Sequence, residues 1–510
     1  MRLVSTSNTS NELSKFLSEV RQQLGEDAVN LSEETLRRYG ETTLPGSDLP
    51  PAAVVYPAST DEVATLVELA NRYQIALYPI SNGNNIGLGS RAPVNAGQVV
   101  VDLGRKMNRI IEVNTTIGIA IIEPGVTYRQ LYDELERLGG QFIPDVTSGP
   151  PEGSVVGNAL DKGAGYTPYA DHLGMSCGLE VVLGNGSVIR TGDGSMPNAR
   201  MTHMSKYTYG PFLDGLFAQS NFGIVTRMGM WLMPRPPAIV SFAFTFEDDA
   251  AIGAIVEAAA PLKLSNFVPT MMRVSNDLWM TISEEPYPGY RPGVGHLPDE
   301  ERRALRERHG LGAWTVSGAF YGASQAAIQP QIDRVRAHFS RIPGCRYIAH
   351  EEALERVPLK AAVDAYSGRP GYNELRQLSW RPGGGLAAFT PGVPMDKALV
   401  EKCTDTSRRI LNQNGLEYAK MYVCGARFAR GLHHIIWNRD HEAEDQAADC
   451  AYRSLVAAYA EMGLQAGRAP LRYQELHWSY LDPNIRAACN ALKAALDPSG
   501  IIAPGRYGIG

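Results

Sequence analysis

The chain has 510 residues, of which 44% are hydrophobic and 20% charged, and its formal net charge at pH 7 is -6. This length predicts two or three domains, and the slightly negative charge gives no general attraction to nucleic acid or to an anionic membrane surface. Neither a membrane-spanning apolar run nor an apolar leader segment occurs in the sequence, so we expect a cytoplasmic protein.

The opening segment predicts alternating helices and strands. Apolar residues at helical spacing run through 11–40, and a short strand is expected at 54–56. Ser59 and Glu62 form a capping-box pattern before a helix that reaches Ala70, and a strand follows at 75–78. This order predicts a β-α-β-like opening.

The segment from Pro79 to Ser90 follows that strand and contains three glycines, at 83, 87 and 89, and three asparagines. Glycines after a strand allow several backbone N–H groups to converge on an anion. Their spacing fits neither G-x-G-x-x-G nor the nucleoside triphosphate loop. The turn alone therefore leaves a phosphate cradle and an ordinary connection equally open.

The rest of the first half alternates strands with loops of small residues. Strands are expected at 99–103, 109–113, 117–123, 179–183, 187–191 and 228–233, helices at 127–138 and 155–161, and loops at 147–158, 163–172 and 220–226. Gly184-Asn-Gly186 is a hairpin signal. Four such loops predict a ligand held by backbone amides over a footprint longer than one phosphate.

Pro234-Arg-Pro-Pro237 marks a domain boundary. Beyond it, strands are expected at 240–246, 314–321, 418–424 and 432–438, and helices at 250–260, 298–309, 325–340, 396–414 and 485–496. This mixture favours an α+β fold. The six cysteines are scattered without metal-ligand spacing, and His441 with Asp440 and Glu442 is interpreted as a charged loop, so no metal site is predicted.

The chain resembles the flavoprotein family of vanillyl-alcohol oxidase and 4-cresol dehydrogenase, also called p-cresol methylhydroxylase. The matching segments are Pro79-Ile-Ser-x-Gly-x-Asn85, Asp102–Arg109, Glu123–Tyr128, Gly157–Tyr169, Ser220–Val225 and Asp497–Gly505. The resemblance implies a two-domain α+β flavoprotein. Residues 1–236 and a C-terminal return at 465–510 would bind FAD, and residues 237–464 would form a cap over the substrate.

The resemblance also implies which residues hold FAD. They are Pro79, Ile80, Ser81, Asn82, Gly83, Asn84, Asn85, Gly87, Leu88, Pro150, Ser154, Gly157, Asn158, Gly165, Tyr166, Gly223, Ile224, Val225 and Arg506. The family's flavin-linking histidine and tyrosine align with Leu386 and Leu378, which cannot form the bond. We therefore expect noncovalent FAD with a lowered reduction potential.

The expected substrate site departs from the family pattern. Members that oxidise para-substituted phenols hold the phenolate with two tyrosines and an arginine. Arg468 matches the arginine, but Leu88 and Gly467 stand in place of the tyrosines, and Gly149 replaces an acid of the oxidase branch. One arginine can still hold an anion. Without the two tyrosines, however, the sequence does not predict that this anion is a phenolate.

Five further residues are candidates for charge near the flavin. Arg468 and Arg506 would stabilise a reduced flavin, and the alternative for each is a surface or interdomain salt bridge. His433 and His434 occupy the place of a family histidine pair, of which at most one can face the site, and the alternative for each is a core histidine. Glu374 is either a buried acid or base with a raised pKa, or an exposed helix residue.

The expected function is an FAD-dependent oxidoreductase that removes a hydride from a benzylic or similarly activated carbon of a small aromatic substrate, such as a 4-alkylphenol or an aromatic alcohol. Two alternatives remain: a bulkier, non-phenolic substrate, or a catalytically silent flavin-binding protein. The resemblance implies reoxidation by oxygen or a cytochrome-type carrier, and a homodimer or higher homo-oligomer.

Overall fold

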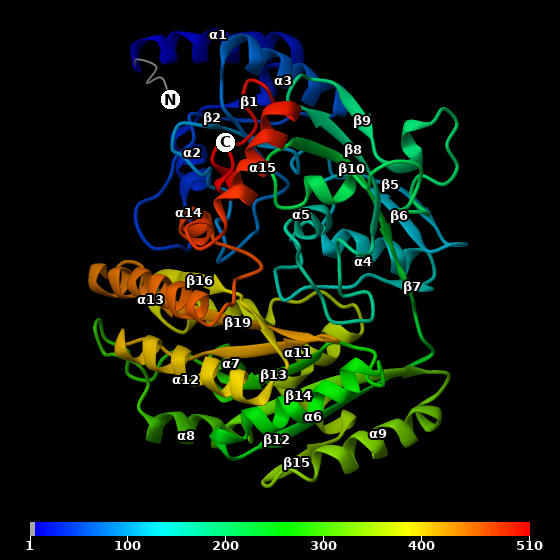
Figure 1. Cartoon of the computed structure of the whole chain (residues 1–510), viewed down its shortest axis with the longest axis vertical. Helices are drawn as coiled ribbons and strands as arrows, with labels where there is room; N and C mark the ends of the chain where they lie inside the picture. Colours follow the sequence, from blue (N-terminus) through cyan, green and yellow to red (C-terminus); the bar gives the residue numbers. More distant parts are fainter. Residues whose placement is uncertain (1–5) are drawn as a thin grey trace.

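The computed structural model describes residues 6–510, which form two bodies stacked along the long axis of the molecule (Figure 1). The first body holds α1 (Thr6–Leu24), β1 (Val29–Asn30), α2 (Glu33–Gly40), β2 (Ala53–Val55), α3 (Thr60–Tyr73), β3 (Leu77–Ile80), β4 (Val99–Asp102), β5 (Ile110–Asn114), β6 (Ile119–Ile122), α4 (Tyr128–Arg137), β7 (Phe142–Ile143), α5 (Val155–Leu160), β8 (Ser176–Leu183), β9 (Val188–Arg190), β10 (Gly223–Trp231) and β11 (Met233–Pro234). The C-terminal α14 (Gln474–Trp478) and α15 (Pro483–Leu496) return to it.

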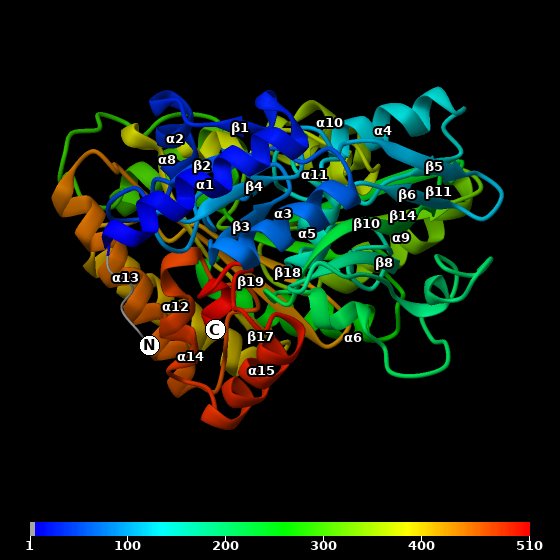
Figure 2. The ribbon, with the colours of Figure 1, turned by 90° about the horizontal axis from the view of Figure 1, so that it is seen from above.

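A small sheet in the order β1-β2-β4-β3 organises the first body. Strands β2 and β3 both run parallel to β4, whose residues Val99, Val100 and Val101 are fully buried, as expected for a parallel strand covered on both faces. Helices α1 and α3 lie side by side over it (Figures 1 and 2). Ser59 caps α3 by accepting a hydrogen bond from the Glu62 N–H, which agrees with the predicted β-α-β-like opening.

The C-terminal tail completes this sheet edge. The N–H of Leu77 on β3 donates to the carbonyl of Ile501 at 2.8 Å, and the N–H of Ala503 donates back to the Leu77 carbonyl at 2.6 Å. Lys493 of α15 donates to the Asp497 carboxylate at 2.6 Å and to the Ile502 carbonyl at the same distance. The strand that leads into the glycine-rich loop is therefore fixed by residues from the far end of the sequence.

A second sheet of the first body, β5-β6-β10-β8-β9, is antiparallel throughout. The Gly184–Gly186 hairpin between β8 and β9 is confirmed. The predicted loop at 220–226 is wrong in its second half, because β10 begins at Gly223. Its branched residues Ile224 and Val225 pair with Val182 and Val181 of β8, and this pairing outweighs the loop signal of the glycine.

The second body is built on one antiparallel sheet in the order β15-β12-β14-β13-β18-β19-β16, with β17 pairing with β19. Its elements are β12 (Ala238–Phe246), α6 (Ile252–Leu264), β13 (Met272–Asn276), α7 (Asp277–Thr281), α8 (Asp299–Arg308), β14 (Trp314–Gly322), α9 (Gln325–Phe339), β15 (Cys345–Ile348), α10 (His350–Glu355), α11 (Val357–Tyr366), β16 (Gly385–Phe389), β17 (Gly392–Pro394), α12 (Lys397–Gln413), β18 (Lys420–Cys424), β19 (Phe428–Trp437) and α13 (Glu442–Glu461). The predicted α+β class is confirmed.

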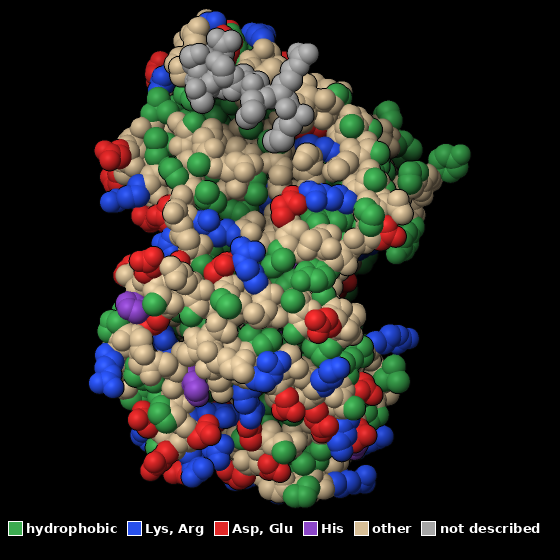
Figure 3. Space-filling view, turned by 60° about the vertical axis from the view of Figure 1, so that its left-hand side comes forward, with side chains coloured by type: hydrophobic (Ala, Val, Ile, Leu, Met, Phe, Trp, Pro, Cys, Tyr) green, Lys and Arg blue, Asp and Glu red, His purple; other side chains and the backbone are tan. Residues whose placement is uncertain are grey.

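Alternation along the strands separates the two faces of this sheet. Phe242, Phe244 and Phe246 pack in the core formed with α6, α9, α12 and α13, whereas Ala243 belongs to the core shared with α11 and the first body. Acidic and basic side chains are interspersed over the outside of the second body (Figure 3). The inner face is therefore the one that can form a site with the first body.

Two sequence predictions are refined. The helical pattern at 11–40 is divided between α1 and α2, because Gly25, with φ of 99°, ends α1 and the short strand β1 precedes α2. The charged residues at 440–442 are a loop only in part: His441 is the N-cap residue of α13, a helix of 20 residues whose first turn carries Glu442, Glu444 and Asp445. Acidic residues favour a helix N-terminus, which explains this charge cluster.

Across residues 6–510 there is no cluster of three metal-ligating side chains. Within the same range, every helix is too short or too polar to cross a bilayer.

Candidate functional site

The main cavity lies where the two bodies meet. From the first body it is lined by residues of the segments 78–90, 147–161, 217–225 and 502–507, together with Leu103, Pro124, Tyr128 and Arg468. From the inner face of the second body it is lined by Leu375, Leu386, Ala388, Thr390, Leu432 and His434. The predicted loops are thus brought together around one elongated space.

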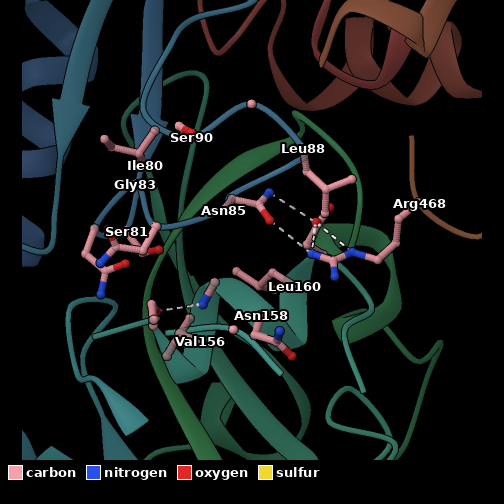
Figure 4. Close-up of a pocket in the computed structure, with 18 of the residues that line it drawn as sticks. Ile80, Ser81, Gly83, Asn85, Leu88, Ser90, Val156, Asn158, Leu160 and Arg468 are labelled. Carbon is pink, nitrogen blue, oxygen red and sulfur yellow. Dashed lines mark hydrogen bonds and ion pairs between the residues drawn. The ribbon is translucent and has the colours of Figure 1, made fainter. Parts of the chain in front are cut away.

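The glycine-rich loop after β3 forms one wall (Figure 4). Its turn requires glycine at 83, where φ is 67°. The side chains of Asn82 and Asn84 donate to the Glu152 carbonyl at 2.8 and 3.0 Å and hold the loop from outside. Within residues 6–510, the backbone N–H groups of 82–86 have no hydrogen-bond acceptor. This row of donors fits a pyrophosphate.

The loop before α5 forms the neighbouring wall at very close range. A Cβ on Gly157 would clash with the Ser81 hydroxyl, so only glycine permits the approach. Ser154 caps α5, accepting from the Gly157 N–H at 2.8 Å and donating to the Pro124 carbonyl at 2.5 Å. Pro150, Asn158, Gly223, Ile224 and Val225, which the resemblance assigns to the cofactor site, also line the cavity.

Three residues that were predicted to bind the cofactor do not line the main cavity. Gly87 donates its N–H to Thr43 Oγ1 at 3.1 Å, and its place is needed for packing because a Cβ there would clash with Leu386. Gly165 packs on the Asp145 carboxylate, which accepts from the N–H of Tyr166 at 3.2 Å. Tyr166 faces a smaller second cavity.

Arg468 points into the main cavity toward Asn85 (Figure 4). Its Nε donates to Asp161 Oδ2 at 2.9 Å, and its Nη2 donates to the same oxygen and to Asn85 Oδ1 at 3.3 Å. Burial disfavours ionisation of Asp161, yet the positive charges of Arg468 and Arg506 outweigh it and hold the pKa of this carboxyl below its usual value. The carboxylate therefore fixes Arg468 in place.

Arg506 supplies a second positive charge from the tail. It donates to the Tyr78 hydroxyl and, at 3.3 Å, to the Tyr507 hydroxyl. Tyr507 in turn donates to Asp161 Oδ1 at 3.0 Å. Burial raises the pKa of both tyrosines, so they remain neutral. Arg506 is thus a cavity-lining residue within a buried polar network, not a surface salt bridge.

The two adjacent histidines face opposite sides of β19. His434 lines the cavity, its Nδ1 lies 2.6 Å from Gln377 Oε1, and burial lowers its pKa to about 4. His433 is fully buried on the other face, 2.9 Å from the Ser407 hydroxyl and 3.0 Å from Lys420 Nζ. Only His434, as a neutral imidazole, can contact a ligand in the cavity.

Glu374 is not an exposed helix residue. It lies in a short 3-10 turn, forms an ion pair with Arg273 of β13, and lines the second cavity beside Tyr166. The two cavities share Thr147 and Ser148. Glu374 therefore does not line the main cavity but lines the neighbouring second cavity.

Several lining residues escaped the sequence interpretation, chiefly Asp161, Tyr78, Tyr128 and Tyr507. Asp161 lies within the matching segment Gly157–Tyr169, so its position was signalled but its role was not. Its role depends on Arg468, which reaches it from a distant segment of the sequence. Tyr128, whose hydroxyl is 3.2 Å from His172 Nδ1, ends the matching segment Glu123–Tyr128, so its position too was signalled but its role was not.

A row of N–H groups without acceptors among residues 6–510, small residues on the opposite wall and two arginines along one cavity fit an FAD-binding oxidoreductase. Residues 51–192 match the FAD binding domain family. The chain is 35% identical to the 4-cresol dehydrogenase [hydroxylating] flavoprotein subunit of Pseudomonas putida over 98% of this chain and 96% of that protein. It therefore belongs to the vanillyl-alcohol oxidase and p-cresol methylhydroxylase family, as predicted.

Two further comparisons support this placement. The solved structure of p-cresol methylhydroxylase with substrate bound superposes with a TM-score of 0.95 at 34% identity, covering 98% of this chain and 97% of that one. The 1'-carboxy-chondrochloren decarboxylase of Chondromyces crocatus is 31% identical over 97% of each chain. The protein is an FAD-dependent enzyme of this family, which removes the catalytically silent alternative.

Proposed function

We propose that this enzyme oxidises a benzylic or similarly activated carbon of a small aromatic substrate. The observation that carries the proposal is Arg468, held by Asp161 at the cavity beside nonpolar lining from the second body. Bound FAD supplies the acceptor for the hydride. The aromatic ring would pack against Leu88, Leu375 and Leu432, which exclude water from the reacting carbon.

The polar residues of the chain then act on charge and protons. The guanidinium of Arg468 binds an anionic group of the substrate, and Arg506 adds positive charge that favours a reduced flavin. His434, neutral because burial lowers its pKa to about 4, donates from Nδ1 to Gln377 Oε1, which leaves Nε2 as the ring nitrogen that can accept a hydrogen bond or a proton. Glu374 is a positioning residue for Arg273 in the second cavity.

A second candidate keeps the chemistry but changes the substrate to a bulkier, non-phenolic compound. A Cβ at Gly467 would meet no atom within 4 Å, so space opens beside Arg468 where the family pattern has a tyrosine. Leu88 stands in place of the second tyrosine of the family pattern and has no hydroxyl. The similarity to a decarboxylase that acts on a carboxylated compound supports this candidate as well.

Anaerobic reduction of the flavin tests the proposal. We expect bleaching of the visible flavin band by at least one member of a panel of alkylphenols, aromatic alcohols and arylalkyl acids. Arg468→Ala should slow this reduction by about a hundredfold or more if the arginine binds the reacting anion. Arg468→Lys, which keeps a charge beside Asp161, serves as the folding control. Reduction by no panel member would contradict the proposed function, and full activity of Arg468→Ala would contradict the role of the arginine.

The electron acceptor, assembly and location are proposed on family likeness and composition. A cytochrome-type carrier is supported by similarity to a protein named as a flavoprotein subunit, with oxygen as the other acceptor to test. A homodimer or larger homo-oligomer is proposed on the family resemblance. A cytoplasmic location is supported by six cysteines, which are all free thiols in the described chain.

A further inference from the structure

Arg430 belongs to the strand that carries the cavity-lining histidine. On β19, Arg430, Leu432 and His434 alternate with Gly431 and His433 and therefore share one face. Leu432 and His434 both line the main cavity. Arg430 is the next residue on this face, and at this point β19 pairs with Gly392 of β17.

The segment that carries Arg468 is anchored at the same corner of the sheet. Pro391 bridges to Ala466, and the Gly431 N–H donates to the Pro391 carbonyl at 2.8 Å. The Thr390 hydroxyl donates to the Arg468 carbonyl at 3.3 Å. These bonds place Arg430 next along β19 to the cavity-lining Leu432 and anchor the Arg468 segment at the same corner of the sheet, although Arg430 itself stands behind the cavity lining.

The two arginines differ in their partners. Arg468 is bound by Asp161. For Arg430, by contrast, no carboxylate of residues 6–510 lies within ion-pair distance, although the residue is half-buried. Burial, followed by the positive charge of Arg468, lowers the pKa of Arg430, and the more distant carboxylates of Asp171 and Asp161 oppose that shift only in part. Two positive charges near the same corner of the sheet, with a carboxylate in contact with only one of them, leave an excess of positive charge that an anion would offset.

The space beside Arg468 is open at Gly467, and the two tyrosine hydroxyls of the family pattern are missing because Leu88 and Gly467 stand in their places. A Cβ on Gly467 would have no neighbour within 4 Å, and Leu88 is apolar. Arg468 uses Nε and Nη2 on Asp161 and Asn85, which leaves Nη1 for a ligand. A planar carboxylate has two oxygens that match guanidinium donors, whereas a phenolate has one.

We propose that Arg430 and Arg468 together bind a carboxylate carried by the substrate, which makes arylalkyl carboxylic acids the substrate class of this enzyme. The proposal rests on the proposed function, since it places the carboxylate in the same cavity as the oxidised carbon. It assigns Arg430 as a specificity-determining residue.

The test uses the oxidised holoenzyme and two probes that differ only in charge, phenylacetate and phenylacetamide. Each is titrated while the visible flavin spectrum is recorded. Phenylacetate should bind at least about tenfold more tightly than the amide, because charge-assisted hydrogen bonds are stronger than neutral ones. Arg430→Gln should abolish this preference by weakening phenylacetate binding and leaving the amide unchanged. Arg427→Gln, at an exposed arginine on the preceding turn, is the matched control and should retain it.

Each outcome decides the proposal. Equal affinities in the wild-type protein overturn it, and a preference that survives Arg430→Gln overturns the role of Arg430. If Arg430→Gln does not retain FAD, Arg430→Lys keeps the charge and must keep the preference for phenylacetate. Flavin reduction by a neutral aromatic alcohol without carboxylate binding would leave the proposed function standing and this inference refuted. Carboxylate binding through Arg430 without reduction of the flavin by any panel member would support this inference and contradict the proposed function.

Discussion

At the scale of single residues, Leu386 connects the cofactor to the packing of the glycine-rich loop. It lines the cavity, packs against the position where Gly87 has no Cβ, and donates its backbone N–H to the Thr43 carbonyl at 2.8 Å. Leu378, the other position aligned with a flavin-linking residue, is partly buried and packs against the same hydrophobic cluster that contains Leu386. Neither side chain carries a nucleophile that could attach to the flavin.

We therefore predict that FAD is released when the protein is denatured. After precipitation with acid, the yellow colour and the flavin absorbance should be in the supernatant. A protein of the family with a covalent flavin provides the control, because its colour stays in the pellet. A yellow pellet from this protein would refute noncovalent binding.

At the scale of elements, the C-terminal tail is held by a buried ion pair. Asp497 is 1% exposed and accepts from the N–H of Ile502 at 2.8 Å as well as from Lys493. Burial lowers the pKa of Lys493, and the Asp497 carboxylate opposes that shift. The pair thus fixes the turn that delivers the tail to β3 and places Arg506 at the cavity.

Asp497→Asn should destabilise the protein by about 3 to 5 kcal/mol, because Lys493 would stay buried without a counter-charge. Thermal unfolding and the FAD content of the purified protein are the measurements, and both should fall. Glu12→Gln removes the exposed partner of Lys15 and should leave the melting temperature nearly unchanged, because water screens this pair. Equal melting temperatures for the two variants would contradict this account.

The elements that the sequence predicts well are those with a local signal. The capped helix α3, the Gly184–Gly186 hairpin and the strands β12 and β14 have caps, turn residues or alternation in their own residues. Helix α13 was missed because its first turn is charged and its mean pattern is weakly periodic. The pairing of Glu374 with Arg273, and of Asp161 with Arg468, depends on long-range contacts that no local pattern encodes.

At the scale of the whole molecule, burial keeps several histidines neutral across both bodies. Burial lowers the pKa of His434 and of His477 to about 4, from an ordinary value of 6.5. The unfolded chain binds more protons than the folded one between these values. The contribution of these two histidines to the free energy of unfolding is therefore fully present above about pH 6.5 and is lost as the pH falls toward 4.

His477→Gln should remove one share of this pH dependence. His477 is buried and lies 3.2 Å from the Tyr452 hydroxyl, to which glutamine can also bond. The free energy of unfolding lost between pH 7 and 4.5 should be smaller in the variant by about 2 to 3 kcal/mol. Urea unfolding followed by tryptophan fluorescence measures it. His296→Gln, at an exposed histidine, should match the wild type, and an unchanged pH slope in His477→Gln would sink the argument.

The pairing of β3 with Ile501 and Ala503 has a consequence for the synthesis of the protein. A nascent chain that has emerged only as far as Gly463 contains the glycine-rich loop and the whole second body, but neither Arg468 nor the strand partner of Leu77. Cofactor loading should therefore wait until the last segment has left the ribosome. Until then, the exposed edge of β3 is open to pairing with other chains, and this interval is when the protein is most exposed to aggregation.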